Sequence, residues 1–260
     1  MDTAAALPIV NWIFWGALAG GTALAVGLTE WWGGTTSGYR LFMAWVIGAG
    51  AVIWLASELR VSPGLPDDPS ADLRRVGVWI FAGLTLAYLV ASHADWPRMA
   101  LVIGAGLLGI GLLVVMALGG GTDSPPLLAA VLVATALALG AVNAAMLLGH
   151  WYLVTPKLSP APLRRLIWLL VGALAAQGLL VGWSVMMGSG PLLDSGVAWL
   201  TGLRVAVGIV LPLAIAVLAL LATGSVSLQA TTGLLYIGLA MIMAGTIGAA
   251  ALSYLSGSPV

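Results

Sequence analysis

Long runs of apolar residues, separated by short polar segments, follow one another along the whole chain. A bilayer has a hydrocarbon core of about 30 Å, which a helix of roughly 20 apolar residues can cross. Backbone groups in lipid must be paired within their own segment, so each run is expected to be a helix. Eight runs meet this length: residues 9–32, 40–59, 76–93, 99–119, 127–154, 166–188, 196–222 and 229–255. The pattern therefore predicts an all-α fold, a polytopic integral membrane helical bundle of about eight transmembrane helices with short loops.

The polar segments between these runs are too short to fold by themselves. The longest, from Arg60 to Arg75, carries charges of both signs and no metal-ligand spacing. We therefore expect residues 1–260 to form a single transmembrane helical domain. The first run has no basic segment before it and is too long for the apolar part of a secretory signal, so it is expected to be a retained helix. The sequence has no evident fixed-period repeat, although eight helices leave room for a duplication of four.

Composition supports lipid as the solvent of this chain. Hydrophobic residues make up 61% and charged residues 7%, whereas a soluble domain carries roughly 25% charged residues. The mean hydropathy is +1.10. A formal net charge of zero provides no basic field for nucleic acid. The absence of cysteine excludes disulfides, iron–sulfur clusters, zinc–cysteine sites and covalently attached haem. The lipid bilayer is the expected partner, and nucleic acid is not.

The distribution of lysine and arginine among the short loops predicts the orientation of the chain. One membrane face collects five of these residues: Arg40, Arg98, Lys157, Arg164 and Arg165. The opposite face collects three: Arg60, Arg74 and Arg75. Because positive loops stay in the cytoplasm, we expect a multi-pass protein of the inner (plasma) membrane with both termini outside the cytoplasm.

Small residues inside the predicted helices indicate close helix packing. Gly16 and Gly20, and likewise Ala244 and Gly248, lie four apart, a spacing that lets helix backbones approach. Pro212 predicts a kink in the seventh helix, because its ring removes one backbone hydrogen bond.

Arg204 is the most informative polar residue within a predicted helix. It lies about 14 Å beyond Ser195 at about 1.5 Å per residue, which places it near the bilayer midplane. A guanidinium at that depth is expected to face the bundle interior. One interpretation is a buried hydrogen bond to Gln177, to a backbone carbonyl or to Glu58. The other is a role in binding a ligand or moving charge.

Two amides lie near the middle of adjacent, antiparallel helices. These are Asn143 in the fifth helix and Gln177 in the sixth. A hydrogen bond between them, worth about 0.6–2 kcal/mol, is the simplest explanation for both.

His150 closes the fifth helix within a group of polar and aromatic residues. Asn143 shares its helical face, and Trp151 and Tyr152 follow it. An imidazole can exchange protons near neutral pH, and aromatic faces can stack on a ring. This combination suits the head group of a quinone or similar amphiphile, with a further polar group from the same membrane face. The candidates for that group are Glu30 and Gln229. The alternative is an interfacial aromatic belt with one water-facing histidine.

Other chemistries find less support. His93 and His150 are the two histidines, and both lie at predicted helix ends, which does not favour a bis-imidazole haem. No catalytic residue and no metal site is predicted. The single lysine, Lys157, lies in a loop, so a retinal Schiff base within a helix is excluded. The chain is therefore not expected to be a stand-alone enzyme, and an enzyme acting on lipid ranks last.

Two functional hypotheses follow. The first is a membrane subunit of a respiratory or photosynthetic electron-transfer assembly, with partner membrane subunits and a quinone site near His150. Eight-helix membrane anchors of respiratory oxidoreductases share this general architecture, although no motif matches residue by residue. The alternative is a transporter or permease for a small solute or lipid that uses Arg204. Transport predicts an aqueous cavity reaching Arg204 and pseudo-symmetric halves, whereas a subunit predicts a filled core.

Overall fold

The computed structural model describes residues 3–61, 70–94, 97–119, 124–155, 158–187, 198–224 and 227–256. Within these ranges the regular structure is helical and contains no strand. The helices are α1 (Thr3–Trp32), α2 (Ser37–Val61), α3 (Ala71–His93), α4 (Met99–Gly119), α5 (Pro125–Val154), α6 (Ala161–Met186), α7 (Ala198–Val205), the π-helical turn η3 (Ala206–Val210), α8 (Leu211–Gly224) and α9 (Leu228–Ser256).

Among the described residues, eight helical spans are long and apolar enough to cross a membrane, with α7, η3 and α8 counted as one continuous span. This confirms the predicted all-α membrane bundle. Several helices begin earlier than predicted. α3 starts at Ala71 and α6 at Ala161, since their first turns carry arginines that an apolar run does not include. Lys157 lies outside the described residues.

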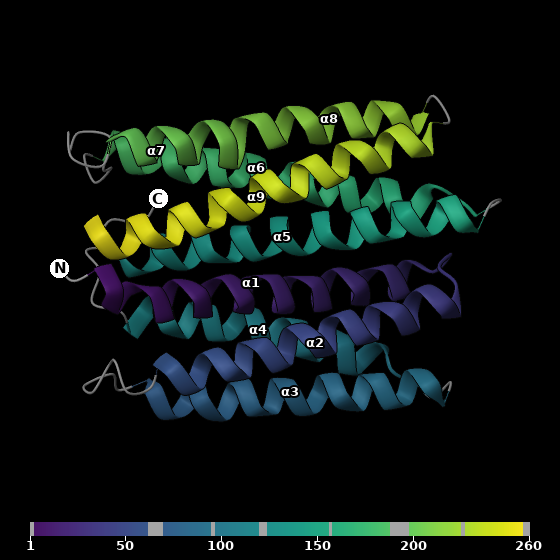
Figure 1. Ribbon diagram of the computed structural model, residues 1–260, viewed down its shortest axis with the longest axis horizontal. Coiled ribbons are helices and arrows are strands. Elements are labelled where there is room, and N and C mark those ends of the chain that lie inside the picture. Colours follow the sequence, from purple (N-terminus) through teal and green to yellow (C-terminus); the bar gives the residue numbers. More distant parts are fainter. Residues whose placement is uncertain are drawn as a thin grey trace.

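The helices form two groups of four (Figure 1). In the first bundle, α1 packs against α2 and α4, and α3 packs against the same two helices. In the second bundle, α5 packs against α6 and α9, and α8 packs against the same two. The bundles meet through α1 and α5, with α4 against α5 and α1 against α9 on either side. Each bundle therefore presents its first helix to the other.

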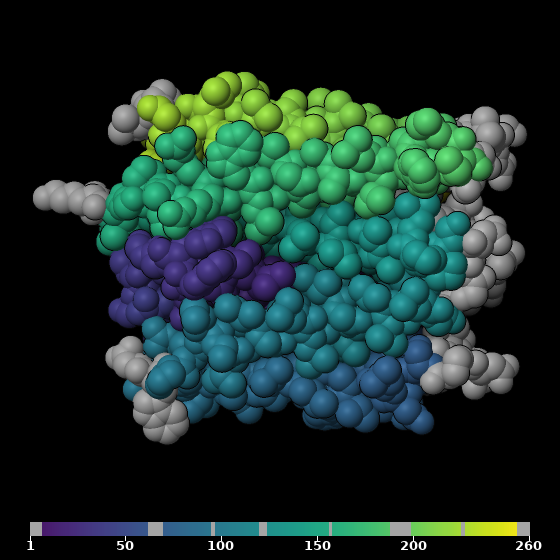
Figure 2. Space-filling view, turned by 180° about the vertical axis from the view of Figure 1, so that it is seen from behind, coloured from purple at the N-terminus to yellow at the C-terminus, as the bar shows by residue number. Residues whose placement is uncertain are grey.

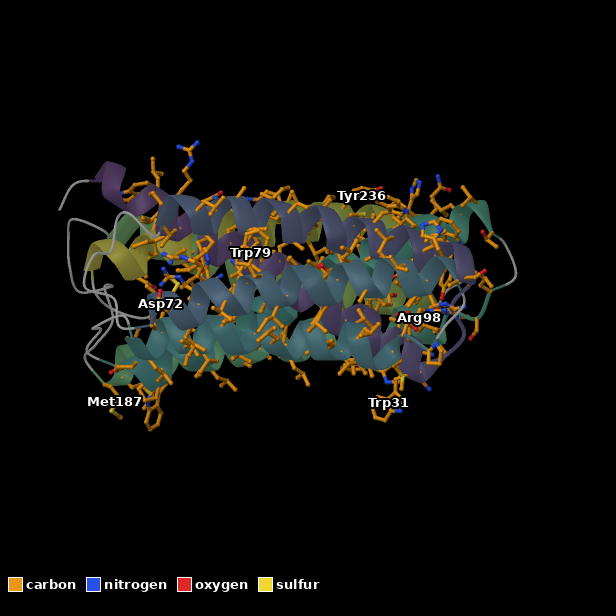
Figure 3. The ribbon with its side chains drawn as sticks, turned by 90° about the horizontal axis from the view of Figure 1, so that it is seen from below. Trp31, Asp72, Trp79, Arg98, Met187 and Tyr236 are labelled. Atoms are coloured by element: carbon orange, nitrogen blue, oxygen red, sulfur yellow. The ribbon has the colours of Figure 1, made fainter. Side chains whose placement is uncertain are left out.

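The two ends of the molecule can be told apart by the termini. We call the end at which α1 begins and α9 ends the proximal end, and the opposite end the distal end (Figure 1). Asp72 and Met187 lie toward the proximal end, and Trp31 and Arg98 toward the distal end (Figure 3). From behind, the surface shows the end of α1 emerging between the two bundles on the distal side (Figure 2).

Backbone-to-backbone contact joins the bundles at Gly21 of α1 and Gly140 of α5. A Cβ atom on Gly21 would lie 1.8 Å from the carbonyl oxygen of Ala136, and one on Gly140 would lie 2.0 Å from the carbonyl carbon of Gly21. Only glycine fits at both positions, because a Cβ atom cannot approach a backbone atom so closely. The joint between the bundles is therefore tight at its centre.

The expected small-residue packing is confirmed in α1 and wrong in detail in α9. Gly20 lies against Gly109 of α4, with a contact of 3.1 Å from its Cβ position. In α9 the close contact comes from Gly245, whose Cβ position is 2.3 Å from the Cα atom of Gly208. Gly248 faces open space, and Ala244 is exposed. The spacing alone does not say which glycine of a helix faces its neighbour.

The second bundle repeats the burial pattern of the first. A shift of 119 in residue number carries α1 onto α5 and α2 onto α6. It pairs Gly21 with Gly140, and it pairs the sequence Ala-Leu-Ala-x-Gly ending at Gly21 with the same sequence ending at Gly140. Six of the nine buried residues of α2 fall on buried residues of α6: Met43, Ala44, Ile47, Ala51, Trp54 and Glu58 on Pro162, Leu163, Leu166, Leu170, Ala173 and Gln177.

The third helix of each bundle repeats with one residue inserted. Arg74, Gly77, Val78, Phe81, Thr85 and Tyr88 of α3 fall on Arg204, Gly208, Ile209, Pro212, Ala216 and Ala219, all of them buried. The shift is 130 at the pair Arg74 and Arg204 and 131 from the pair Gly77 and Gly208 onward. The extra residue therefore lies between Arg204 and Gly208, where η3 begins. There the N–H of Leu211 donates to the carbonyl of Ala206, and this wider turn accommodates the extra residue.

The fourth helices, α4 and α9, also share a burial pattern, with a constant shift of 133 in residue number. Val102, Ala105, Gly109, Leu112, Leu113 and Ala117 fall on Leu235, Gly238, Ile242, Gly245, Thr246 and Ala250, again all buried. The contact between α1 and α9 then mirrors that between α5 and α4. We infer a pseudo-two-fold axis that runs along the helices through the contact of Gly21 with Gly140. The sequence showed no such repeat, because few of the paired residues are identical.

Candidate functional site

Arg204 is buried in the second bundle, with 1% of its surface exposed. Its Nη2 donates a hydrogen bond to Oε1 of Gln177, and its Nη1 donates to the carbonyl oxygen of Gly208 at 3.5 Å. Nε2 of Gln177 donates in turn to the carbonyl of Ala134 in α5, at 3.3 Å. The predicted interior position and the predicted partner Gln177 are confirmed. Because α7 begins at Ala198, Arg204 lies about 9 Å into its helix, nearer the proximal end than expected.

The first bundle contains the counterpart of this arrangement. Nε of Arg74 lies 3.0 Å from Oε2 of Glu58, and both side chains are fully buried. The Arg74 guanidinium also lies over the ring of Trp12, 5.6 Å from its centroid. Each bundle thus pairs a buried arginine on its third helix with an acceptor on its second. Glu58 therefore pairs with Arg74, and the interpretation that it accepts a hydrogen bond from Arg204 is wrong.

Arg74 was expected to be a loop charge and is instead part of the core. Its neighbours at helical spacing, Gly77, Val78 and Phe81, are also buried. That spacing was the signal in the sequence that could have placed Arg74 on the inner face of a helix.

The expected hydrogen bond between Asn143 and Gln177 is wrong. Nδ2 of Asn143 donates instead to Oγ1 of Thr22 in α1, at 3.1 Å. The bond from Gln177 reaches α5 at Ala134, about 14 Å from Asn143 along the helix axis. Asn143 therefore stabilises the joint between the bundles, and Gln177 stabilises packing within the second bundle.

A second polar cluster lies at the distal end of the first bundle. The hydroxyl of Tyr88 donates to Oε1 of Glu30 at 2.6 Å, and Nε of Arg98 lies 3.4 Å from Oε2. Tyr88 is fully buried, whereas 8% of the Glu30 side chain and 12% of the Arg98 side chain are exposed. The cluster joins α1, α3 and the segment before α4. Sequence reasoning named Glu30 but missed both of its partners.

The group predicted around His150 does not converge on one site. His150 is exposed, and its ring meets the edge of the Tyr236 ring with 6.5 Å between centroids. The hydroxyl of Tyr152 donates to the carbonyl of Ser159 at 2.8 Å, and Gln229 is exposed on α9. Among the described residues, no hydrogen bond joins His150 to Glu30 or to Gln229.

Trp151 belongs to the joint between the bundles. It stacks on Phe42 of α2, with ring centroids 6.2 Å apart. Its counterpart Trp32 lies under the guanidinium of Arg165 of α6, at 5.7 Å. Each tryptophan therefore reaches from the first helix of its own bundle to the second helix of the other.

The two histidines lie in different bundles. His93 ends α3 and meets the edge of the Trp45 ring, with centroids 6.2 Å apart, while His150 belongs to α5. They do not face each other across a pocket, so their positions do not fit a haem held by two imidazoles. No group of three or more side chains able to hold a metal ion occurs among the described residues.

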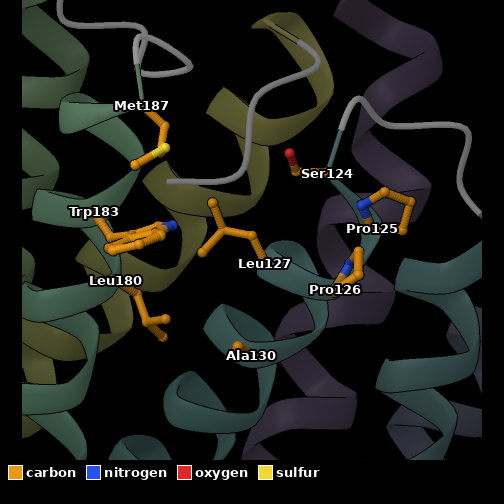
Figure 4. Close-up of a pocket in the computed structure, with 8 residues that line it drawn as sticks. All are labelled: Ser124, Pro125, Pro126, Leu127, Ala130, Leu180, Trp183 and Met187. Carbon is orange, nitrogen blue, oxygen red and sulfur yellow. The ribbon is translucent and has the colours of Figure 1, made fainter.

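A pocket of about 560 Å³ opens at the proximal end between the start of α5 and the end of α6 (Figure 4). It is lined by Ser124, Pro125, Pro126, Leu127, Ala130, Leu180, Trp183 and Met187. The lining is mainly apolar, and neither Arg204 nor Gln177 contributes to it. This pocket therefore does not provide the aqueous route to Arg204 that transport would need.

The chain matches no protein-family model, no curated protein and no solved structure. The fold and the buried clusters define its class: a multi-pass α-helical membrane protein built from two pseudo-equivalent bundles.

Proposed function

We propose that this chain is the membrane-embedded subunit of an electron-transfer assembly and that it binds a quinone-class amphiphile at its distal end. The carrying observation is the Glu30, Tyr88 and Arg98 cluster, which combines a carboxylate and a phenol at the distal membrane edge of the first bundle. Such groups can exchange protons with a ring whose tail stays in lipid. His150 and Tyr236 offer a second aromatic edge at the same end.

The remaining features of this proposal concern partners and location. A chain with so little outside its helices would pass electrons to redox centres in partner membrane subunits. Quinone is the proposed ligand, with no haem. The larger number of basic residues in the distal loops supports a distal end in the cytoplasm, and both termini outside it, in the inner (plasma) membrane.

Transport of a small solute is the second candidate function. It is favoured by the two pseudo-symmetric bundles of the chain, because many transporters are built from such repeats. Two observations favour the subunit over the transporter. Gly21 and Gly140 bring the two bundles into backbone contact, which opposes rocking of one bundle against the other. Arg204 is also engaged by Gln177 and Gly208 within the packed core.

Native purification separates the two functions. The proposal expects the chain to co-purify with redox subunits and the complex to oxidise quinol or reduce quinone. A His150→Ala variant tests the distal edge of the second bundle, where a slower turnover would assign His150 to the site. A chain that purifies alone, and that moves a solute across proteoliposomes without electron transfer, would contradict the proposal and support transport.

A further inference from the structure

We propose that Glu30, Tyr88 and Arg98 bind the head group of a quinol-class amphiphile, and that Tyr88 and Glu30 carry its protons toward the distal aqueous phase. This inference rests on the proposed function and adds the role of each side chain and the path of the protons. The second bundle serves as an internal control for the first.

The second bundle builds the same position without any charged side chain. The residues that correspond to Glu30, Tyr88 and Arg98 are Gly149, Ala219 and Thr231. There the hydroxyl of Thr231 donates to the carbonyl of Ala219, 3.4 Å away. A Cβ atom on Gly149 would lie 2.7 Å from Oγ1 of Thr232. Small residues therefore fill this position by direct packing.

Comparing the two bundles separates the polar side chains that both bundles need for packing from those that occur in one bundle only. A buried arginine with an acceptor on the second helix occurs in both bundles, as Arg74 with Glu58 and as Arg204 with Gln177. Such shared pairs belong to the packing of the four-helix unit. The Glu30 cluster occurs in the first bundle only, so the four-helix unit does not require it.

Energetics argue in the same direction. Taking a carboxylate and a guanidinium out of water is unfavourable, and apolar replacements are often as stable as the ion pair. Ionisable groups inside membrane proteins therefore mark functional sites. The second bundle is such an apolar replacement within the same chain, since it packs with Gly149 and Ala219.

The exposure of the three side chains rises toward the distal face. Tyr88 is fully buried, Glu30 is 8% exposed and Arg98 is 12% exposed. Glu30 lies between the other two, accepting from the Tyr88 hydroxyl on one oxygen and facing Arg98 with the other. Tyr88 and Glu30 thus form a short path from the bundle interior toward water, and Arg98 faces the second oxygen of the Glu30 carboxylate.

The chemistry of the site is that of quinol oxidation. The two O–H bonds of the quinol break, and its two protons leave one after the other through the Glu30 carboxylate to distal water. Its two electrons pass to a redox centre of a partner subunit, which is the oxidant. Trp31, the residue after Glu30, is 68% exposed, and its ring is suited to stack on the head group at the lipid edge.

The test uses the full chain in lipid nanodiscs and a benzoquinone with a decyl tail, with empty nanodiscs as the blank. Binding is measured by quenching of tryptophan fluorescence. We expect saturable quenching by the wild type and at least about tenfold weaker binding, or about 1.4 kcal/mol, in Glu30→Gln and Tyr88→Phe. Glu58→Gln is the matched control, because it changes a second buried carboxylate of the first bundle into the glutamine found at the corresponding position of the second bundle. It should bind as the wild type does.

An infrared difference spectrum of the chain in its complex with the redox subunits, recorded on adding the corresponding quinol, gives an independent measurement. A protonated-carboxyl band should be present in the wild type and in Glu58→Gln, and absent in Glu30→Gln. Tyr88→Phe keeps the Glu30 and Arg98 pair and covers the case in which Glu30→Gln does not fold.

The outcomes distinguish the inference from the proposed function. Equal affinities in the wild type, Glu30→Gln and Tyr88→Phe overturn this site while leaving the proposed function in place. A wild-type chain that binds no quinone overturns both. A loss of binding in Glu58→Gln as large as in Glu30→Gln overturns the site, because the effect then follows any buried carboxylate.

Discussion

The Arg204 guanidinium donates a hydrogen bond to the carbonyl oxygen of Gly208, at 3.5 Å, within its own span. In a regular α-helix that carbonyl would accept from the N–H of the residue four positions later, which is Pro212 and has no N–H. The side chain thus supplies a donor that the backbone lacks. A π-helical turn lies directly before Pro212, whereas the kink predicted there stays a prediction.

Replacing Arg204 by methionine should lower the stability of the protein. The change leaves Oε1 of Gln177 and the carbonyl of Gly208 without this donor, and unsatisfied buried groups cost about 1–3 kcal/mol. Thermal unfolding of the purified protein in detergent measures the effect. The control is Arg164→Met, since Arg164 is exposed and its loss should leave the unfolding temperature unchanged. Equal unfolding temperatures for Arg204→Met and the wild type would show that the guanidinium is not needed in the core.

Removing Arg74 should destabilise the protein more than removing Arg204. Arg74→Met removes the guanidinium that pairs with the fully buried Glu58 carboxylate, and breaking a buried ion pair in this way costs about 3–5 kcal/mol. Adding Glu58→Gln to Arg74→Met should recover part of the loss, because the buried charge is then gone. The same unfolding assay decides, and a smaller loss for Arg74→Met than for Arg204→Met would contradict the expectation.

The glycine contact between the bundles should not tolerate a methyl group. Gly21→Ala or Gly140→Ala places a Cβ within about 2 Å of backbone atoms of the other helix, which forces the helices apart and costs about 1–3 kcal/mol or more. Gly104→Ala and Gly172→Ala are matched controls, because nothing lies within 4 Å of their Cβ positions. Yield of folded protein and unfolding temperature are the measurements. Losses of equal size at all four positions would refute a special role for the joint.

The absence of native cysteine makes the orientation directly testable. Single cysteines at Asp72 and Ser37, both exposed, mark the proximal and distal ends. If the distal end is cytoplasmic, a membrane-impermeant maleimide should label Asp72→Cys in intact cells and Ser37→Cys only after the cells are broken. The reverse pattern would invert the proposed topology.

The helices could be predicted because their signal is length and apolarity, which a bilayer imposes on every span. Which face of a helix is buried could not be predicted equally well. Lipid and protein interior are both apolar, so an inward residue such as Leu113 and an outward one such as Leu107 look alike in sequence. The repeat was hidden for the same reason, since it is a repeat of burial and only rarely of identity.

The candidate sites were predicted only as far as single residues allow. Arg204 could be placed because a guanidinium deep in an apolar run must face inward, and Gln177 lay at a comparable depth. Tyr88 and Arg98 could not be joined to Glu30, since their meeting depends on how α3 and the start of α4 pack on α1. His150 and Glu30 share the distal end but belong to different bundles, a separation that loop order does not reveal.

The number of helices in each bundle has a consequence for the orientation of its partner. Four crossings return the polypeptide to the membrane face from which it started, so the second four-helix unit enters the bilayer in the same orientation as the first. Two separate copies of such a unit could associate side by side in the same manner, through a single glycine at the axis. Within one chain the two units need not be identical, because each has its own sequence. The second unit has the extra residue of the π-helical turn, and the first has the distal carboxylate.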